Sequence, residues 1–318
     1  MISWHPQFSV RPVPIALSRY TDAERAAVHA LLSHSSLAPE FDWLVDRGEL
    51  KDPLRHPWGD PEALWVGRLD GELAGFCMLM RLVGQHGRWA FLRIGVAAPF
   101  RRRGLGRAFV RAVEARIDAL PAGERPLEVC TSAWLPNPAA EGFAAGSGFA
   151  HSRYFWSMER PRGAPASVSW PAGIETCTFD GSEQALADWT ACYNDSFGEN
   201  YLTAIATVEH TRELTRLSHF RADGVVLAYH DGRCVGFCRN AVHQDHGEID
   251  VLGVVHEARG IGLGRSLLRW GVAWLEERDV PHVRLMVGGE NEAALRLYRS
   301  EGFETVRTRR IWARAVRA

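Results

Sequence analysis

The chain has 318 residues, of which 46% are hydrophobic and 24% are charged, as in an ordinary folded globular protein. The formal net charge of −1 gives no general attraction to nucleic acid or to an anionic membrane, so we expect neither as a partner. The first 13 residues lack the apolar core of a signal peptide, and no apolar run reaches the about 20 residues that span a bilayer. We therefore expect a cytoplasmic protein, long enough for two domains of about 150 residues each.

In chain order, two halves show the same succession of elements. From about residue 13 to residue 158, we predict a strand, a helical region, a hairpin, a strand, a helix, a strand, a helix and closing strands. A segment rich in Pro, Gly, Ala and Ser at 161–172 is typical of a linker. It separates predicted domains at 1–160 and 173–318. The second half repeats the order, with strands at 174–179, 225–229, 234–241, 248–255 and 282–287, helices at 183–194, 208–220, 262–278 and 291–301, and a tail at 303–316 that closes the sheet.

A glycine-rich motif precedes a helix in each half, at Arg101–Gly106 and again at Arg259–Gly264. Glycines let the backbone pass close to a ligand, and the N–H groups and dipole of the following helix favour an anion there. Neither copy has the third glycine of a dinucleotide fingerprint or the Gly-Lys of a P-loop. The motif therefore predicts a phosphate-binding loop in each half.

Two further matches extend the repeat along the chain. Asp70-Gly71 corresponds to Asp231-Gly232, and Asn137 corresponds to Asn291. The offset between the halves falls from 161 to 158 to 154 residues in chain order, as small loop deletions would produce. The chain therefore contains two copies of one domain.

The second copy combines Arg-x-x-Gly-x-Gly after a strand with Asn-x-x-Ala-x-x-Leu-Tyr-x-x-x-Gly-Phe at Asn291–Phe303. This pattern resembles the GNAT superfamily of acetyl-CoA-dependent N-acetyltransferases, over nearly the whole chain. The doubled arrangement, with the stretch Gly247–Val254, is similar to the mycothiol synthase type of tandem GNAT enzyme. The resemblance implies an α/β (α+β) fold of two tandem GNAT-fold domains, each a mixed, mostly antiparallel sheet flanked by helices. It also implies acetyl-CoA as co-substrate.

Acetyl transfer to an amine needs a base for the ammonium proton, whose pKa is about 10, and an acid for the leaving thiolate. Glu248 and Asp250 share one face of a strand by its period of two. The resemblance implies that Glu248 is the base; the alternative is a carboxylate that faces solvent or pairs with an arginine. It likewise implies that Tyr298 is the acid; the alternative is a core tyrosine.

The resemblance also implies which residues bind acetyl-CoA in the second half. The backbone of Leu252 and Val254 is expected to pair with the pantetheine amides, and Asn291 either bonds the pantetheine or caps its helix. The pyrophosphate is expected at Arg259, Gly260, Ile261, Gly262, Leu263, Gly264 and Arg265. The corresponding candidates in the first half are Val96, Arg101, Arg103, Gly104 and Gly106.

The first half lacks both proposed catalytic side chains. Ala90 occupies the position of the base, and Ala144 occupies the position of the tyrosine. The first domain is therefore expected to hold CoA without the usual chemistry, to support the second domain, or to line the acceptor site. Two rival functions stay open: a CoA-binding or regulatory protein without transferase activity, and transfer of another acyl group.

Other features carry weaker expectations. The six cysteines lack a Cys-x-x-Cys pair, which favours buried thiols. The segment His243–Glu248 alternates histidines and carboxylates, but no further ligand is evident, so no metal is predicted. Because two domains can enclose a cleft, we expect a small-molecule amine as acceptor; an oligomer is possible but not indicated. Candidate contacts to the acceptor are Asn194, Asp195, Glu199, Asn200 and Tyr201.

Overall fold

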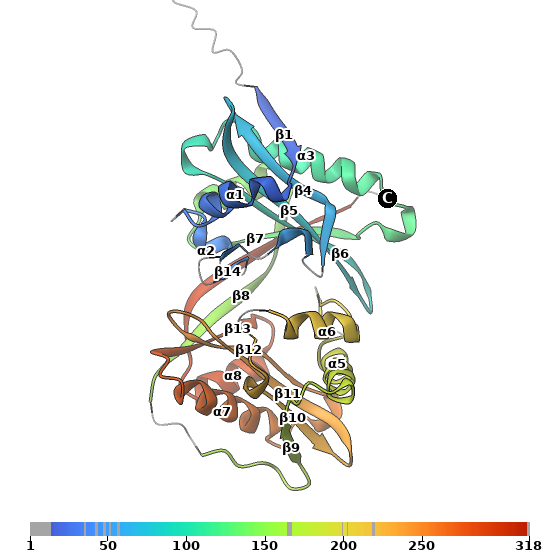
Figure 1. Cartoon of the computed structure of the whole chain (residues 1–318), viewed down its shortest axis with the longest axis vertical. Helices are drawn as coiled ribbons and strands as arrows, with labels where there is room; N and C mark the ends of the chain where they lie inside the picture. The colour runs from blue at the N-terminus through green and yellow to red at the C-terminus, as the bar shows by residue number, and fades with distance from the viewer. Residues whose placement is uncertain are drawn as a thin grey trace, which may run out of the picture. The chain divides into compact units, whose positions relative to one another are not determined.

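The computed structural model describes residues 14–316, apart from 35, 42–43, 47–48, 51, 56–57, 164–166, 199, 202 and 218–219. Contacts between residues divide the chain into two compact units, and Figure 1 labels most of their helices and strands. Unit 1 takes in residues 1–54, 60–79 and 93–119, and unit 2 takes in 55–59, 80–92 and 120–318. The predicted domains, at 1–160 and 173–318, follow the sequence repeat instead, and their bounds stay a prediction.

The elements follow the order that the repeat predicts. The strands are β1 (Ile15–Arg19), β2 (Val45–Asp46), β3 (Glu49–Leu50), β4 (Gly59–Leu69), β5 (Glu72–Gly84), β6 (Gly87–Val96), β7 (Glu128–Trp134), β8 (Ala150–Pro161), β9 (Glu175–Thr178), β10 (Val225–His230), β11 (Arg233–Val242), β12 (Gly247–Val254), β13 (His282–Gly288) and β14 (Glu304–Ala315). The α-helices are α1 (Arg25–Leu32), α2 (Ala38–Phe41), α3 (Leu105–Asp118), α4 (Pro138–Gly146), α5 (Glu183–Phe197), α6 (Val208–Thr215), α7 (Leu263–Glu276) and α8 (Glu292–Ser300). Short 3₁₀ helices are η1 (Asp22–Glu24), η2 (Pro53–Arg55), η3 (Ala98–Phe100), η4 (Ala122–Glu124), η5 (Ala222–Gly224) and η6 (His256–Ala258).

Unit 1 contains β1, most of β4 and β5, and the end of β6, which are neighbours in the strand order β1-β4-β5-β6, with α3 packed against them. A Cβ placed at Gly67 of β4 would lie 2.5 Å from Leu105 Cδ1, and one placed at Gly75 of β5 would lie 3.0 Å from Leu105 Cδ2. Only glycine at these two strand positions lets α3 approach the sheet so closely. Leu105 and Phe109, which the helical spacing predicts to face the core, are both buried.

The same hairpin turn occurs in both repeats. Asp70 and Gly71 have φ of 55° and 82°, and Asp231 and Gly232 have φ of 50° and 76°. Two successive residues at positive φ make the two-residue turn that matches strand twist, and Asp-Gly is among its favoured sequences. The hairpins predicted from these dipeptides are confirmed.

The large sheet of unit 2 has the strand order β7-β14-β8-β13-β12-β11-β10-β9. Most neighbours are antiparallel, but β12 and β13 are parallel, so the sheet is mixed, as the GNAT resemblance implies. The order also shows an exchange of strands between the repeats. β8, the last strand of the first repeat, pairs with β13 of the second, and β14, the last strand of the second repeat, pairs with β7 of the first.

This exchange corrects the simple expectation for the tail. We expect the tail to close the sheet of its own half, yet β14 lies between β7 and β8, which both come from the first repeat. In the register, Trp134 of β7 stands opposite Arg309, and Met158 of β8 stands opposite Leu285 of β13. Backbone hydrogen bonds thus complete each repeat with a strand of the other, so this part of the sheet needs both repeats.

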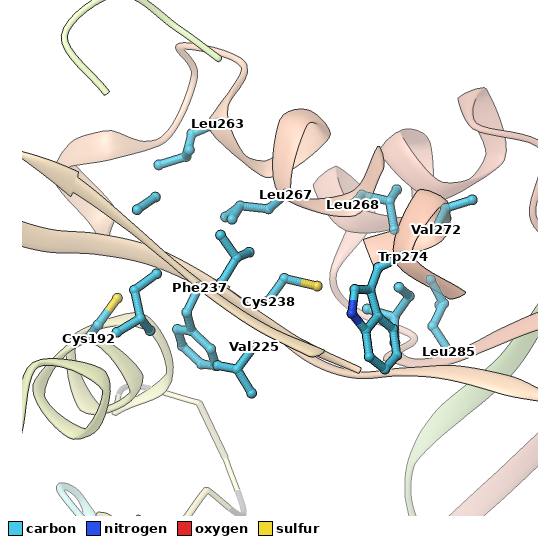
Figure 2. Packing of buried hydrophobic residues seen from close by; sticks show 14 of the residues in the cluster. Cys192, Val225, Phe237, Cys238, Leu263, Leu267, Leu268, Val272, Trp274 and Leu285 are labelled. Carbon is cyan, nitrogen blue, oxygen red and sulfur yellow. The ribbon is translucent and has the colours of Figure 1, made fainter. Parts of the chain in front are cut away.

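The core of the second repeat has α7 and α5 on opposite faces of β11. Figure 2 shows Leu267 of α7 on one side of the strand and Cys192 of α5 on the other, with Phe237 of β11 between them. All three side chains are buried. A Cβ at Gly271 of α7 would lie 2.7 Å from Ile249 Cδ1, so glycine permits the close contact between α7 and β12. This packing fixes β12 and the start of α7 relative to each other.

Two details differ from the sequence expectations. The helix predicted at 208–220 ends at Thr215, because Phe220 turns inward to pack 6.0 Å from the ring of Phe179. Five cysteines are buried as predicted, but Cys177 is exposed, since it lies on β9 at the end of the strand order. None of the helices in the described ranges is both long and apolar enough to cross a membrane.

Candidate active site

The loop that begins α7 has the backbone form of an anion-binding site. Gly260 and Gly262 have φ of 84° and 95°, and Gly262 caps α7 without a side-chain hydrogen bond. A Cβ at Gly264, in the first turn, would meet only ordinary contacts at 3.8 Å, so the surroundings are open. The first N–H groups of a helix lack intrahelical partners and lie at its positive end. The start of α7 can therefore receive a phosphate group through its backbone.

The loop of the first repeat has the same backbone form. Gly104 has φ of 92° and caps α3, again without a side-chain hydrogen bond. Arg102 stands where the second repeat has Gly260, and it too has a positive φ, of 66°. The repeat thus extends to the left-handed residues of the loop, which are uncommon for any residue except glycine.

The first arginine of each motif braces the preceding strand. Arg259 Nε donates to the Val254 carbonyl at 3.1 Å, and its terminal nitrogen donates to the Ser196 carbonyl at 3.1 Å. Arg101 makes the corresponding pair of bonds in the first repeat, at 3.0 and 3.4 Å. In the structure, these guanidinium groups hold the end of the preceding strand. The sequence leads us to expect them at the pyrophosphate instead.

Two other arginines of the predicted phosphate sites form ion pairs. Arg265 pairs with the Glu301 carboxylate and donates to Ser300 Oγ at 3.0 Å. Arg103 pairs with Asp70 at 2.8 Å. Since these side chains are already engaged, the backbone N–H groups of the loop and first turn are the main candidates for holding the pyrophosphate.

Strands β12 and β13 separate beside this loop. They pair as far as Ile249 and Leu285, and the described residues show no pairing between them beyond that point. The pairing of β12 with β11 continues to Val254, opposite Gly236. Leu252 and Val254 therefore lie on a stretch of β12 whose other edge is open. An extended ligand with amide groups can pair with such an edge, as an added strand does.

Glu248 lies directly before Ile249, the last residue of β12 that pairs with β13. Its Oε2 is 2.9 Å from Nε2 of His243, and its side chain is 23% exposed. Burial raises the pKa of this carboxyl, but the hydrogen bond from His243 and the nearby His243, His246 and Arg284 together lower it below its usual value. The carboxyl is therefore ionised at neutral pH and can accept a proton.

Asp250 is arranged differently from its neighbour Glu248. The β11–β12 register shifts so that Asp250 is an extra residue, a β-bulge. Its carboxylate pairs with Arg239, whose guanidinium lies 6.0 Å over the ring of Trp189 in α5. Pairing with an arginine, the alternative that the sequence leaves open for Glu248, is thus found at Asp250.

Tyr298 lies on α8, and only 8% of its surface is exposed. Its ring lies 6.2 Å from the ring of Phe303. Burial, and to a smaller extent Cys238, raises the pKa of its phenol to about 12. Within the described ranges, the structure gives its hydroxyl no hydrogen-bond partner. The phenol therefore stays protonated over the accessible pH range and keeps its proton available.

Asn291 caps α8 through its side chain. Its Oδ1 accepts from the Ala294 N–H at 3.1 Å, and Asn137 makes the matching bond to Ala140 at 3.1 Å at the start of α4. The structure thus shows the capping role that is one of the two alternatives for Asn291, and Asn137 has the same role in the first repeat. A contact between Asn291 and the pantetheine stays a prediction.

Three histidine rings stand in a column beside Glu248. The loop 243–246 is closed by a hydrogen bond from the His243 N–H to the His246 carbonyl at 2.9 Å. The ring of His246 stacks 4.6 Å from His243 on one side and 5.8 Å from His282 of β13 on the other. The sequence motif does not show that His243 contacts the expected base, although His243 begins the four-residue hairpin loop and Glu248 lies just after it, so that the spacing permits the contact.

The potential metal ligands of His243, His246 and Glu248 lie within 4.8 Å of one another, so the structure brings together three side chains of the segment singled out in the sequence. However, Arg284 places a guanidinium nitrogen 3.3 Å from Nε2 of His246. A second cation beside this positive group is disfavoured. We therefore assign the cluster to hydrogen bonding within the protein.

The residues predicted to contact the acceptor have structural partners. Asn194 donates to the Ala206 carbonyl at 2.9 Å and accepts from its N–H at 2.8 Å, which closes the loop after α5. Asp195 pairs with Arg233 at 2.8 Å. The Asn200 N–H donates to the Phe197 carbonyl at 2.8 Å. These contacts position the loop; their relation to an acceptor stays a prediction, and Glu199 lies outside the described residues.

Tyr201 docks onto β7. Its hydroxyl donates to the Glu128 carboxylate and lies 3.5 Å from Cys130 Sγ. The guanidinium of Arg153, on β8, lies 3.7 Å from the centre of its ring. The loop of the second repeat thus rests on strands of the first, which the sequence could not show because the two strands belong to the other repeat.

The first repeat has no catalytic side chains at the corresponding positions. Ala90 on β6 and Ala144 on α4 are both buried, at 0% and 1% exposure. Neither methyl group can accept or donate a proton. Among the described residues of the two repeats, only the second therefore combines the loop, the separated strands, a carboxyl and a phenol.

Comparison with known proteins agrees with this arrangement. A family model described as the acetyltransferase (GNAT) family matches residues 28–149 and 186–303, one match in each repeat. A mycothiol acetyltransferase of Thermobispora bispora is 34% identical over 295 residues, covering 90% of this chain and 94% of that protein. A mycothiol acetyltransferase of Thermomonospora curvata is 35% identical over 237 residues, covering 74% of this chain and 76% of that protein.

Solved structures show the same tandem fold. A GCN5-related N-acetyltransferase from Sphaerobacter thermophilus matches with a TM-score of 0.69 at 22% identity, covering 96% of this chain and 98% of that one. A tandem GNAT protein from the clavulanic acid biosynthesis pathway matches with a TM-score of 0.68 at 18% identity, covering 95% and 98%. The fold is two tandem GNAT domains, and the activity is that of an acetyl-CoA-dependent N-acetyltransferase. The chain belongs to the acetyltransferase (GNAT) family.

Proposed function

We propose that the second repeat carries out the transfer, by direct attack of a small-molecule primary amine on acetyl-CoA. One observation carries the proposal: Glu248 lies where β12 and β13 separate, and its partners keep the carboxyl ionised. Carboxylate, open strand edge and uncapped helix start all belong to one repeat. The first repeat has the loop but no proton acceptor at the matching position.

In the proposed reaction, the Glu248 carboxylate takes one proton from the acceptor ammonium, either directly or through a water molecule. The neutral amine then attacks the thioester carbonyl carbon, and the C–S bond breaks as the tetrahedral intermediate collapses. The Tyr298 phenol gives its proton to the departing thiolate. As the amide forms, the nitrogen loses its second proton, which restores the proton that Tyr298 has given up. The proton taken by Glu248 is released to solvent, so the products are the N-acetyl compound, CoA thiol and one proton.

The cofactor is proposed to bind along β12 and α7. The backbone of Leu252 and Val254 would pair with pantetheine on the open edge of β12. The pyrophosphate would sit on the N–H groups of Gly262, Leu263 and Gly264, at the positive end of the helix. Asn291 is also proposed to contact the pantetheine, from its place at the start of α8.

The first repeat is proposed to retain a second CoA-type loop without chemistry. The support is the shared backbone form at Gly104 and the shared strand-bracing arginine. Candidate groups there remain Val96, Arg101, Arg103, Gly104 and Gly106. Whether this loop binds CoA or serves the fold is decided by the binding measurement that closes the Discussion.

The acceptor class follows from the relatives. Curated proteins that are 34–35% identical are named mycothiol acetyltransferases, which supports an amine of the mycothiol type. The partly exposed Glu248 carboxylate suits a cationic amine, because a carboxylate attracts an ammonium group. We therefore propose small primary amines, with those related to mycothiol first.

Steady-state kinetics tests direct attack. Initial rates measured against acetyl-CoA at several amine concentrations are expected to give intersecting double-reciprocal lines, because both substrates must be bound before transfer. Equal amounts of CoA thiol and N-acetylated amine should form, as measured by thiol titration and mass spectrometry. Parallel lines together with an acetylated protein would indicate a covalent intermediate and contradict the proposal. CoA binding without acetylation of any amine would favour the binding-protein rival.

A further inference from the structure

Within the described part of the chain, the close hydrogen-bond partner of the Glu248 carboxyl is His243. This histidine directly follows β11, and its Nε2 lies 2.9 Å from Glu248 Oε2. At this distance the ring N–H donates a hydrogen bond to the ionised carboxylate. Nothing in the motif around Glu248 requires a histidine at that place, since His243 lies in the hairpin loop after β11 and Glu248 lies on β12. The contact therefore points to a specific role.

The surrounding residues fix the orientation of the His243 ring. The His246 ring stacks on it at 4.6 Å with only 15° between the ring planes. His246 is itself buried, with Nδ1 2.7 Å from Asp245 and Nε2 3.3 Å from Arg284. Arg284 is held in turn by Glu159 of β8 at 2.8 Å. The column is thus tied to the hairpin loop and to two strands, and it leaves His243 little freedom to turn away.

We propose that His243 is the positioning residue of the catalytic base: its Nε2–H fixes the Glu248 carboxylate in the geometry that accepts the proton of the acceptor amine. This inference rests on the proposed role of Glu248 and adds a residue that the family motif does not contain. It also assigns a role to His246, which holds the His243 ring by stacking.

The charged and titratable groups around Glu248 agree with this role. Burial alone raises the pKa of its carboxyl, and the opposing influences come first from the hydrogen bond and charge of His243, then from His246 of the hairpin loop and Arg284 of β13. Asp245 and Glu159 lie one contact further away, against His246 and Arg284, and His282 lies 3.6 Å from Glu159. Burial lowers the pKa of His246, so the positive charge that this ring adds beside Glu248 is lost at a lower pH than for a free histidine. Without His243, the pKa of Glu248 is expected to rise, because burial still raises it and fewer neighbouring groups lower it.

The test compares His243→Ala and His243→Gln with the unchanged chain in kcat/KM from pH 5.5 to 9.5, with EDTA present so that trace metal has no influence. Glutamine keeps an N–H donor but cannot carry a charge. His230→Ala is the matched control, since His230 is half exposed at the β10–β11 turn. Thermal melting and acetyl-CoA titration of each variant separate loss of folding or cofactor binding from loss of positioning.

The acid limb of the pH profile, where Glu248 loses its proton, is expected to move to higher pH in His243→Ala. At pH 5.5 we expect a loss of about threefold or more, because the loss of one hydrogen bond to a charged group corresponds to a rise of about one to two in the pKa, with little loss at pH 9. His243→Gln should recover part of the difference, and His230→Ala should match the unchanged chain. An unmoved acid limb in a folded His243→Ala protein that binds acetyl-CoA would overturn the inference.

The failure of this inference differs from failure of the proposed function. If Glu248→Gln retains full turnover, the proposed base is wrong and so is everything that depends on it. If Glu248→Gln loses turnover while His243→Ala changes rates equally at every pH, the base stands and His243 is only structural. Each outcome therefore decides one of the two claims.

Discussion

Glu248→Gln is expected to lower kcat/KM by about 10²–10⁴-fold, the range typical of general acid–base catalysis. Glutamine has nearly the same size and still offers an oxygen to His243, 2.9 Å away in the present structure, but it cannot take a proton from an ammonium group. The acetyl-CoA dissociation constant should stay nearly unchanged, because the cofactor is proposed to bind to the backbone of β12 and α7. Stopped-time assays of CoA thiol release and calorimetry of acetyl-CoA binding check the two halves of this prediction.

The matched control is Asp231→Asn. Asp231 is 93% exposed at a hairpin turn, with φ of 50°, a conformation that asparagine tolerates well. Removing its charge should leave turnover within a factor of about two, as expected for a surface change that removes no buried contact. Equal loss in both variants would show that the effect of Glu248→Gln is not specific to the proposed base.

Tyr298→Phe is expected to lower kcat by about 10²-fold, because the leaving thiolate then has no positioned proton donor. The free energy of unfolding should change little, since the phenyl ring keeps its place in the core beside Phe303 and the hydroxyl has no partner in the described structure to lose. If Tyr298 were only a core residue, both turnover and stability would be nearly unchanged. Assays of kcat together with thermal melting distinguish these cases.

Tyr229→Phe is the control, because it is expected to lower stability and to leave kcat unchanged. The Tyr229 hydroxyl, on β10, donates to the Asp188 carboxylate of α5 at 3.1 Å. Its loss should cost about 1 kcal/mol of stability, the usual scale of one hydrogen bond, and leave kcat unchanged. In the unchanged enzyme, the phenol of Tyr298, with its pKa of about 12, should cause no fall in activity up to about pH 11. A fall near pH 10 that disappears in Tyr298→Phe would contradict the raised pKa.

Local features of the fold could be predicted from sequence because short-range chemistry decides them. The Asp-Gly dipeptides predict the hairpin turns, and Asp231 and Gly232 do adopt the positive φ values that such turns need. The glycines before α7 predict a helix start open to an anion, and Gly262 caps that helix as expected. Asn291 is likewise a side-chain cap. In each case a few neighbouring residues determine the backbone.

The exchange of β8 and β14 could not be predicted in the same way. The repeat assigns each strand to its own half, and strand alternation does not reveal which edge a strand will join. The choice depends on pairing across residues far apart in sequence, such as Arg309 with Trp134. Tertiary contacts of this kind override the symmetry that the repeat suggests.

The sequence offers candidates for the residues that belong to the family pattern, but it does not show the side chains that support them. Glu248 and Tyr298 come from a motif, whereas the roles of Arg259 and His243 depend on side-chain contacts. The pattern alone would assign Arg259 to phosphate binding, but its guanidinium donates hydrogen bonds to the Val254 and Ser196 carbonyls. His243 reaches Glu248 because a four-residue loop joins β11 to β12. Loop geometry and rotamer choice, not residue type, decide such contacts.

The assignment of catalysis to the second repeat is tested most directly by acetyl-CoA calorimetry and turnover of Gly264→Glu and Gly106→Glu. The surroundings of Gly264 leave room for a side chain, and an acidic residue is favourable in the first turn of a helix, so the fold of that variant should survive. Its carboxylate would repel the pyrophosphate at the proposed site. Thermal melting of both variants confirms that each is folded.

We expect Gly264→Glu to abolish turnover and remove one binding site, and Gly106→Glu to retain turnover. If the unchanged chain binds two molecules of acetyl-CoA and Gly106→Glu binds one, the loop of the first repeat also holds the cofactor. Turnover that survives Gly264→Glu but is lost in a folded Gly106→Glu protein would place the chemistry in the first repeat and contradict the account.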